Sequence, residues 1–394
     1  MSADAPIGRA GHPTRVVLVS SMYSPFQNDL AHAMNARDDV EYHVVYTMNR
    51  KNQRGENQRG KHWTAERESA NFIVELFEWS DARDLAAKLD TVLDRIKPDV
   101  IVANGILRAV TYAALQKVSQ RNRSIPTGYW VEHPDLSGSV RRRIAIELVV
   151  RYQARNMDFM LAIGDRAANF YQRCAPRLPV HIVPYGQDLS HHFAIERATE
   201  PSPNEPVRFL FSGQLLPRNN IQNLTAAFTR LAESHHGQWQ FVVAASGPEE
   251  PSVVALQARG TRGWEPVVFD RDYETWLDRI RPFATSDVLV CPSVHAGWAL
   301  VVPEAMAAGM PIIATRNVGA ARYFLRPEVN GIAVDTSVDS IYRALKRFVE
   351  DRYAIIRMSA AAREAATAGT AEFVATLFAE AVKRHAIGHG AGGR

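Results

Sequence analysis

The sequence has little of what several large protein classes depend on. Its 394 residues include two cysteines, Cys174 and Cys291, which lie far apart and form no metal-binding or redox motif. Such cysteine usage fits a reducing compartment. No stretch reaches the roughly 20 apolar residues that a membrane-spanning helix needs, and residues 1–13 contain no apolar run, so we expect no signal peptide. A Walker phosphate loop, a zinc-binding spacing and a Ser/His/Asp set are absent too.

Neither sign of charge has a large excess. The formal net charge is +4, and 22% of the residues are charged against 46% hydrophobic ones. This mildly basic balance suits anionic ligands but is too weak to indicate nucleic acid, so no nucleic-acid partner is expected. We expect a cytoplasmic globular protein that contacts a membrane, if at all, peripherally at its inner face. The length allows two domains of ordinary size.

The first half alternates strands and helices. Residues 14–20 form a continuous apolar run, typical of a strand buried on both faces of a parallel sheet. Similar runs recur between helical segments, which predicts a doubly wound parallel sheet over 14–190 after a flexible N-terminus at 1–13. We expect a loop over 21–28 and a helix from about Asp29. The polar segment 50–61 is expected to be a mobile loop, and its contact with an acceptor is left open.

Composition shifts in the middle of the chain. Residues 196–206 carry three prolines, so we expect a linker over 191–206. The alternation restarts at Val207 and predicts a second parallel-sheet domain over 207–370. A last helix over 371–387 and a disordered glycine-rich tail at 388–394 are expected to follow. The arginine-rich helix over 140–155 is open to two interpretations, a solvated face or a surface for lipid or an acidic acceptor.

The stretch 291–315 reads as a strand end, a loop of small residues, a helix and another strand. Pro303 suits the first turn of a helix, and Glu304 lies beside it at the positive end of that helix. Gly309 and Pro311 are expected to close the helix. Backbone N–H groups at such a loop can meet phosphates, and a carboxylate can accept hydrogen bonds from ribose hydroxyls. This stretch therefore predicts a nucleotide-sugar site.

Two glycine turns support that prediction. Gly213 follows the first strand of the second half and allows close backbone approach, while Arg218 can neutralise a diphosphate. The alternative is a plain strand-to-helix turn. Gly247 follows the next strand and is weak evidence by itself. Asp270 and Asp272 could chelate a metal ion because residues two apart on an extended chain point the same way, but no metal is expected.

Glu132 and His133 follow a buried strand of the first half, at the carboxyl edge of the predicted sheet. His133 could be a base, an acceptor contact or a core histidine, and Glu132 shares the same position.

Taken together, four segments resemble the GT-B glycosyltransferases of family 4 (glycosyl transferases group 1): FSGQLLPRNNIQNLTAAF, DVLVCPSVHAGWALVVPEAMAAGMPIIAT, VPYGQDLSHHF and NVGAARYFLRPEVNGIAV. The resemblance implies two Rossmann-like α/β domains that face each other across a cleft, with the last helix crossing back to the first domain. It implies a retaining, metal-independent hexosyltransferase with no cofactor. The donor would be a nucleoside-diphosphate sugar, UDP first among them, and the acceptor a hydroxyl of a sugar, a lipid-linked molecule or a small molecule. The product would be a glycan, glycolipid or secondary metabolite, and the protein a monomer or homodimer.

The resemblance also implies roles for individual residues. Catalytic roles fall on His133, Glu132 and Arg218. Donor binding falls on Gly213, Gln214, Arg218, Asn219, Gly247, Arg271, Ala296, Gly297, Trp298, Ala299, Leu300, Val301 and Glu304.

Four departures from the family pattern stand beside these roles. The first acid of the family's acidic pair falls on Ala296, its diphosphate lysine on Asn219, and its arginine after the glycine on Gln214. The glycine pair after the first strand is absent, with residues 26–28 in that place. Losing one charge-assisted contact commonly costs ~1.5–3 kcal/mol. The alternatives are therefore a catalytically weakened or inactive glycosyltransferase-like binding protein and, third, an epimerase or phosphorylase.

Overall fold

The computed structural model describes residues 12–21, 24–47, 70–76, 79–104, 109–122, 124–200, 205–273 and 277–388. Contacts divide the chain into two compact units. The first comprises the described residues up to Gln187 together with those from Ala371 onward, and the second comprises Asp188–Thr370. The predicted loop at 50–61 and the tail beyond 388 lie outside the described residues. No helix in the described ranges is long and apolar enough to cross a membrane.

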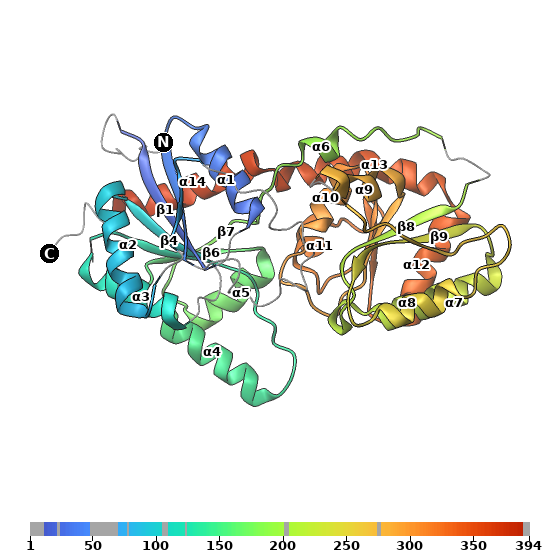
Figure 1. Cartoon of the computed structure of the whole chain (residues 1–394), viewed down its shortest axis with the longest axis horizontal. Helices are drawn as coiled ribbons and strands as arrows, with labels where there is room; N and C mark the ends of the chain where they lie inside the picture. The colour runs from blue at the N-terminus through green and yellow to red at the C-terminus, as the bar shows by residue number, and fades with distance from the viewer. Residues whose placement is uncertain are drawn as a thin grey trace, which may run out of the picture. The chain divides into compact units, whose positions relative to one another are not determined.

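The first unit is built on a seven-stranded parallel sheet with the order β3-β2-β1-β4-β5-β6-β7 (Figure 1). Its strands are β1 (Thr14–Ser20), β2 (Val40–Tyr46), β3 (Ile73–Glu75), β4 (Val100–Asn104), β5 (Thr127–Val131), β6 (Phe159–Ala162) and β7 (Val180–Ile182). Its helices are α1 (Pro25–Asn35), α2 (Ala82–Ile96), α3 (Ala109–Arg121), α4 (Val140–Ala154), α5 (Asp165–Cys174) and α14 (Ala371–Gly388).

The second unit is built on a six-stranded parallel sheet with the order β10-β9-β8-β11-β12-β13. Its strands are β8 (Val207–Gln214), β9 (Trp239–Ser246), β10 (Val267–Phe269), β11 (Val288–Cys291), β12 (Ile312–Thr315) and β13 (Gly331–Val334). Its α-helices are α6 (Ser190–Phe193), α7 (Ile221–Ser234), α8 (Glu250–Gln257), α9 (Arg281–Thr285), α10 (Val301–Ala307), α11 (Gly319–Phe324), α12 (Val338–Glu350) and α13 (Tyr353–Ala366).

The predicted fold class, two doubly wound parallel sheets, is confirmed. In each unit the chain winds outward from a central strand and then returns to that strand's other side, so the strand order reverses between β1 and β4 and between β8 and β11. The central strands are apolar because helices cover both faces of such sheets. In β1, the side chains from Val16 to Val19 are at most 1% exposed.

The last helix packs on the first unit, as predicted. The ring of Phe378 in α14 lies edge-on to Tyr42 and Trp130, with centroids 5.6 and 5.3 Å away. Lys383 pairs with Asp39 at the start of β2. Hydrogen bonding from Arg37 and then from Lys383 lowers the pKa of Asp39 to about 2 despite its partial burial. The final helix is therefore attached to the first sheet by aromatic packing and by an ion pair.

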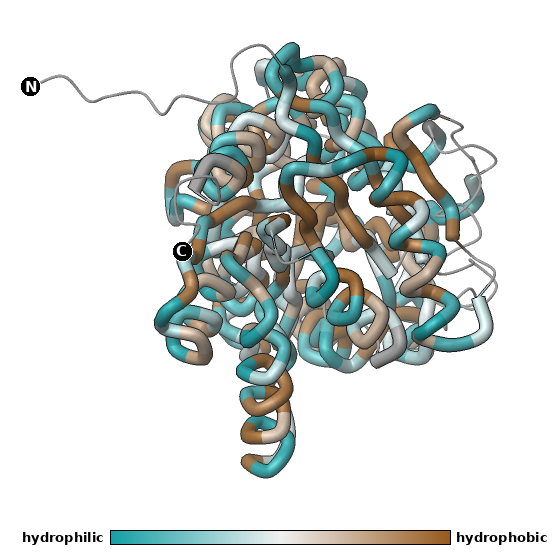
Figure 2. Tube along the Cα trace, turned by 90° about the vertical axis from the view of Figure 1, so that its left-hand side faces the viewer, coloured by the Kyte–Doolittle hydropathy of each residue, from teal (hydrophilic) through white to brown (hydrophobic). Residues whose placement is uncertain are grey.

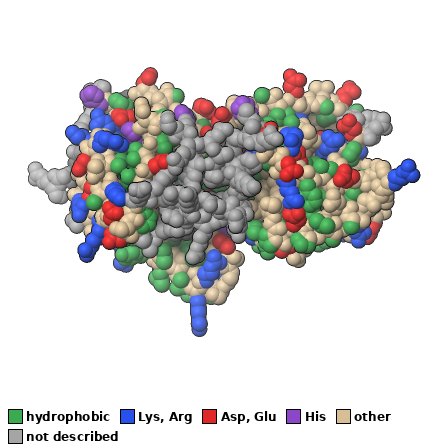
Figure 3. Space-filling view, in the orientation of Figure 1, with side chains coloured by type: hydrophobic (Ala, Val, Ile, Leu, Met, Phe, Trp, Pro, Cys, Tyr) green, Lys and Arg blue, Asp and Glu red, His purple; other side chains and the backbone are tan. Residues whose placement is uncertain are grey.

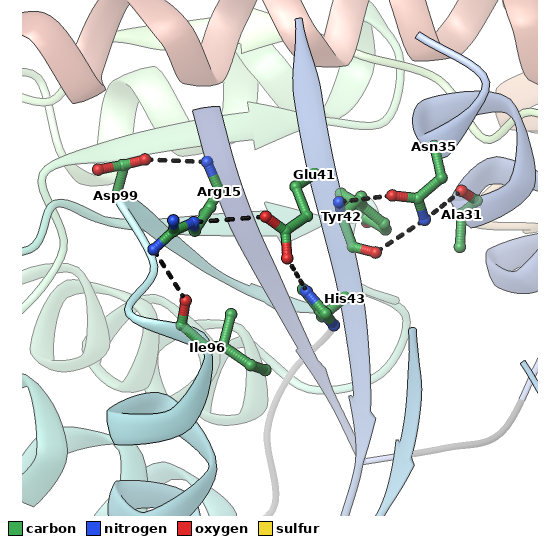
Figure 4. A network of polar contacts seen from close by, with 8 residues as sticks. All are labelled: Arg15, Ala31, Asn35, Glu41, Tyr42, His43, Ile96 and Asp99. Atoms are coloured by element: carbon green, nitrogen blue, oxygen red, sulfur yellow. Dashed lines mark hydrogen bonds and ion pairs between the residues drawn. The ribbon is translucent and has the colours of Figure 1, made fainter. Parts of the chain in front are cut away.

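Polar side chains fix the amino ends of β1 and β2 (Figure 4). The Arg15 guanidinium lies 3.3 Å from the Glu41 carboxylate, and the Arg15 amide donates to Asp99 at 2.9 Å. Asn35 pairs with the backbone of Tyr42 through both its side-chain oxygen and nitrogen, each at 2.8 Å. These contacts fix α1 and the strands in register at the amino end of the first sheet.

The predicted loop over 21–28 is wrong in its second half. Helix α1 begins at Pro25, which occupies the first turn, and Ser24 before it has an extended backbone with φ −150°. Phe26, Gln27 and Asn28 are thus helical, and the Gln27 side chain donates to Asn104 at 2.7 Å. Proline needs no N–H partner in a first turn. A helix start therefore follows β1 where a loop was expected.

The described part of the predicted linker is attached to the second unit. Arg363 of α13 donates to the Phe193 carbonyl at 2.8 Å and also to the Ile195 carbonyl. Arg197 donates to three carbonyls of the same unit. A 3-10 turn at Leu277–Ile280 precedes the short helix α9.

The buried His192 in α6 leads us to predict that the second unit loses stability as the pH falls. Burial lowers its pKa to about 4, reinforced by His191 and opposed by Asp188. Because the unfolded chain takes up this proton near pH 6.5 and the folded chain does not, stability is present above pH 6.5 and falls as the pH drops toward 4. We expect His192→Phe to remove about 1–3 kcal/mol of the loss between pH 7 and pH 5, measured by urea unfolding. His236→Gln, which changes an exposed histidine of the same unit, is the control. An unchanged pH slope in His192→Phe would contradict the prediction.

Candidate functional site

The candidate donor site lies at the carboxyl ends of β8, β9, β11 and β12, where the strand order of the second unit reverses. Ligands of open α/β sheets bind at such a switch point. Gly213 has φ +145°, and a side chain there would meet no atom within 4 Å, so open space adjoins its backbone. Arg218 follows in the 3-10 turn Pro217–Asn219. It is exposed, and no ion pair with another described residue engages its guanidinium. An exposed cation beside open backbone suits an anionic ligand.

Asn219 connects the ends of β8 and β11. Its amide donates to the Gln214 carbonyl at 2.6 Å, and its oxygen accepts from the Ser293 hydroxyl at 3.2 Å. The Val294 amide donates to the Arg218 carbonyl at 2.8 Å. Asn219 thus holds the two loops of the switch point together, which a lysine, with no acceptor, could not do in this way.

The loop after β11 is held against the loop after β12. The Ala296 amide donates to Asn317 at 3.2 Å, and the Ala296 carbonyl accepts from the Gly319 amide at 3.1 Å. A side chain on Gly319 would lie 2.1 Å from the Gly297 carbonyl oxygen, so only glycine fits there. Ala299 adopts φ +83°, a left-handed conformation that is unfavourable for alanine. The loop therefore has a fixed and locally strained path.

Trp298 contributes its indole to packing. Its side chain is 2% exposed, and its ring lies 5.7 Å from Tyr323 and 5.8 Å from Phe324, centroid to centroid. A donor could therefore meet Trp298 mainly through its backbone. Gly297, Ala299, Leu300 and Val301 remain predicted contacts on the same loop.

Glu304 is the acidic residue of this site. It lies in the first turn of α10. Burial raises the pKa of its carboxyl above the usual value, and the positive charge of Arg279 partly opposes this. A carboxylate that has lost part of its hydration gains from hydroxyl donors that a ligand supplies. Its position and electrostatics therefore suit the binding of a diol.

Arg271 and Gly247 take other roles in the described structure. Arg271 forms a two-fold ion pair with Glu250, at 2.7 and 2.9 Å, and its guanidinium lies 4.5 Å from the centre of the Phe269 ring. Its charge is therefore already compensated. A side chain on Gly247 would lie 2.6 Å from the Leu215 carbonyl oxygen, so this glycine permits close packing of two loops.

The acidic pair that could chelate a metal ion has another partner. Arg281 donates to the Asp270 carboxylate, with Nε at 3.0 Å. The described residues include no group of three or more His, Cys, Asp and Glu side chains placed to hold a metal ion.

In the first unit, Glu132 and His133 follow β5. His133 is 7% exposed, and its ring lies edge-on to Phe170 with centroids 5.5 Å apart. The Glu132 carbonyl accepts from the Tyr171 hydroxyl at 3.0 Å. The Tyr185 hydroxyl bonds to the Glu132 and Asn104 side chains, and burial raises the Tyr185 pKa well above its ordinary value. Glu132 and His133 are thus embedded in a buried cluster at the carboxyl edge of the first sheet.

Sequence reasoning missed several residues at these two edges. Gln27, Asn104 and Tyr185 join the cluster around Glu132, and Arg316 follows β12 as a further exposed cation. Each is polar and lies at or just beyond an element that ends at the carboxyl edge. That position is the signal that could have identified them. The structure brings Gly213, Gln214, Arg218, Asn219, Gly247 and residues 296–304 to one edge of the second sheet.

Comparison with known proteins supports this picture. Residues 193–367 match the model of the family described as glycosyl transferases group 1. The uncharacterized glycosyltransferase MJ1607 of Methanocaldococcus jannaschii is 32% identical over 144 residues, which are 36% of this chain and 35% of that protein. The lipopolysaccharide core biosynthesis glycosyltransferase LpsE of Rhizobium meliloti is 28% identical over 161 residues, 40% of this chain and 44% of that protein. The matched part thus spans less than half the length of these relatives.

Among solved structures, HepE of Anabaena in complex with UDP has a TM-score of 0.67 at 18% identity, covering 94% of this chain and 100% of that chain. At this identity the likeness concerns the fold, which is that of the GT-B glycosyltransferases. The family match, the relatives and the fold agree. Residues 193–367 are therefore similar to the glycosyl transferases group 1 family, and the fold is that of the GT-B glycosyltransferases.

Proposed function

We propose that this protein transfers a sugar from a nucleoside-diphosphate sugar to a hydroxyl acceptor, with retention of configuration and without a metal ion. The observation that carries the proposal is the set of residues at the carboxyl edge of the second sheet. There an exposed arginine, Arg218, an open glycine backbone at Gly213 and the desolvated carboxyl of Glu304 lie within one group 1 domain. UDP is the first nucleotide to test, because a structural neighbour was solved with UDP bound.

In the proposed mechanism, Arg218 stabilises the negative charge that develops on the leaving diphosphate. Preorganised charges at such a position contribute most of the rate acceleration in many transferases. Glu304 accepts hydrogen bonds from the ribose hydroxyls and fixes the donor. Arg316, which also follows a strand at this edge, adds positive charge. Backbone amides of Leu300 and Val301 are assigned to the phosphates.

Glu132 and His133 are assigned to the sugar being transferred and to the acceptor. His133 is nearly buried, so it suits a fixed hydrogen-bonding role better than one that needs free access to solvent. The Glu132 carboxyl, bonded to Tyr185, is oriented by a buried hydroxyl. The acceptor is a hydroxyl of a sugar, a lipid-linked molecule or a small molecule, and we place the reaction on the cytoplasmic side of a membrane.

The competing function is a protein that binds a nucleotide sugar without transferring it. Two observations favour it: Asn219, at the lysine position, braces two loops, and Glu250 neutralises Arg271. Both reduce the positive charge available to a diphosphate. Donor hydrolysis measured together with nucleotide binding separates the two functions, since the binding protein would bind without hydrolysing or transferring.

We expect UDP to bind the intact protein in calorimetric titration and Arg218→Gln to weaken that binding about 10- to 150-fold. One charge-assisted contact to a phosphate contributes ~1.5–3 kcal/mol. GDP and ADP are titrated in parallel to identify the base. Arg259→Gln, an exposed arginine at the end of α8, is the control and should bind as the wild type does. Folded protein that binds none of the three nucleotides would contradict the proposed function.

A further inference from the structure

Helix α4 exposes a concentration of large apolar side chains. Of the eleven exposed large hydrophobic residues among the described ones, five lie on this helix. Four are spaced by four residues and share one face: Val140 is 68% exposed, Ile144 52%, Leu148 58% and Tyr152 51%. Val149 is 48% exposed beside them. Such a concentration of exposed large apolar side chains on one short helix marks an interaction surface.

Only the second half of α4 is anchored to its own unit. Val150, Gln153 and Ala154 are buried, at 2%, 4% and 6% exposed, and the Gln153 oxygen accepts from the Tyr129 hydroxyl at 2.8 Å. All residues from 137 to 145 are exposed. Figures 1 and 2 show the helix extending away from the first sheet, with hydrophobic and hydrophilic residues intermixed along it.

The helix start is secured by local contacts instead of packing. The Ser139 hydroxyl caps it by accepting from the Arg142 amide at 3.3 Å, and Arg143 donates to the Leu136 carbonyl at 2.8 Å. Helices in proteins gain most of their stability from burying an apolar face. The first turns of α4 are thus formed, and their apolar face is uncovered in the described structure.

The same helix is strongly basic. Residues 140–155 contain five arginines and one acid, Glu147, which gives this segment a formal charge of +4. Glu147 lies 3.6 Å from Arg151. At 100° per residue, Arg141, Arg151 and Arg155 fall within the sector of the apolar stripe. Figure 3 shows basic and hydrophobic side chains together on this projecting part of the surface.

We propose that α4 binds the surface of an anionic lipid bilayer. Its apolar face would enter the boundary between headgroups and acyl chains, and its arginines would lie among the lipid phosphates. In α4, exposed large apolar residues and arginines share one sector, and this combination of apolar and basic residues suits the boundary between acyl chains and anionic headgroups. Arginine side chains can extend from such a face to the headgroups while their stems remain apolar. The proposal does not depend on the proposed transferase activity.

Charge favours a lipid surface over a second copy of the chain. In a two-fold symmetric dimer the same patch would face itself. The three arginines of that sector would then meet the same three of the other copy, which is unfavourable in a desolvated contact. An anionic bilayer instead offers phosphates to every arginine and an apolar layer to the stripe.

The test is co-sedimentation of the full chain with two kinds of vesicle, phosphatidylcholine alone and phosphatidylcholine mixed with phosphatidylglycerol. We expect binding to the anionic vesicles and at least about tenfold weaker binding to the neutral ones. The double variant Ile144→Glu/Leu148→Glu should lose about tenfold or more in binding, because it puts charge into the apolar face. Arg141→Gln/Arg155→Gln should lose binding too and show a weaker salt dependence.

Matched controls come from the second unit. Val254→Glu/Val329→Glu changes two apolar residues that are each 47% exposed, and Arg259→Gln/Arg262→Gln removes two exposed arginines. Both should bind as the wild type does. Circular dichroism establishes that each variant is folded.

Three results would overturn the proposal. The first is equal binding to both kinds of vesicle, and the second is wild-type binding by the Ile144→Glu/Leu148→Glu variant. The third is a concentration-dependent dimer that this variant abolishes while vesicles bind nothing, which would assign the face to a second copy. An acidic protein partner would likewise leave vesicle binding absent.

Discussion

Replacing Arg197 with methionine should lower the free energy of unfolding of the second unit by about 3–5 kcal/mol, since each buried acceptor that loses its donor costs about 1–3 kcal/mol. Arg197 donates to the carbonyl of Ala308 at 2.6 Å and to those of Ser286 and Phe283 at 2.5 Å each. These carbonyls belong to the ends of α9 and α10, where the last backbone oxygens have no partner inside their helices. Burial lowers the pKa of Arg197 to about 10, so the charge itself is costly to hold there. Methionine would leave all three oxygens without their donor.

Denaturant unfolding monitored by tryptophan fluorescence measures this effect. The two units can unfold separately, so the transition of the second unit must be identified first, by its shift on adding a nucleotide. Arg208→Met is the control, because that arginine makes one exposed side-chain contact, with the Thr285 carbonyl at 3.3 Å. Its change should stay within about 1 kcal/mol. If Arg197→Met changed the free energy of unfolding as little as the control does, the three hydrogen bonds would make no net contribution to stability, which would contradict the prediction.

The role of Arg197 could not be predicted from the sequence. Its neighbours are polar and proline-containing, which is typical of a linker, and composition alone placed it there. Its partners lie between 86 and 111 residues away. Nothing local signals such contacts, since they arise only when the helix ends of a folded unit converge on one buried side chain. Local composition thus predicted that this segment connects the two units. It could not show that the Arg197 side chain attaches the segment to the second unit.

The strands were predictable for a physical reason. Parallel strands covered on both faces must be apolar along their whole length, so runs such as 14–20 and 288–291 are evident without any contact information. The order of elements then fixes the switch points at which site residues gather. Helix α1 shows the limit of this reasoning: Pro25 could have marked its start, but the polar residues that follow resembled a loop. Those residues are polar because they bond to Asn104 and Tyr46 inside the sheet edge.

The candidate site was predictable in position but not in detail. Motif spacing placed Arg218, Asn219 and Glu304 at one edge of the second sheet. It could not show that the Asn219 side chain is engaged by Gln214 and Ser293, or that Trp298 is buried. Such facts depend on which way a side chain turns, and that is decided by non-local neighbours. The remaining acid of the resemblance, Glu304, is therefore the residue at which the candidate site should be tested.

Glu304→Gln should weaken nucleotide binding about 10- to 150-fold while leaving the fold intact, a loss of ~1.5–3 kcal/mol. Burial raises the pKa of this carboxyl, so the ionised form is costly in the free protein. A neutral amide of the same shape should therefore fold at least as well. It would accept hydrogen bonds from ribose hydroxyls more weakly than a carboxylate does. Calorimetric titration with UDP measures the affinity, and thermal unfolding measures the fold.

The pH dependence separates a binding role from a structural one. Hydroxyl donors favour the ionised carboxylate, so wild-type affinity should be full above the raised pKa of Glu304 and fall as the pH drops through it. The Glu304→Gln variant should lack this dependence because its side chain does not titrate. Glu265→Gln, an exposed acid of the same unit, should keep both the affinity and the pH profile of the wild type. An affinity for UDP within twofold of wild type in Glu304→Gln would make Glu304 a helix-start carboxylate only. The family's acidic pair would then have lost its function at both positions, Ala296 and Glu304, and the competing function of a binding protein would lose its ribose contact as well.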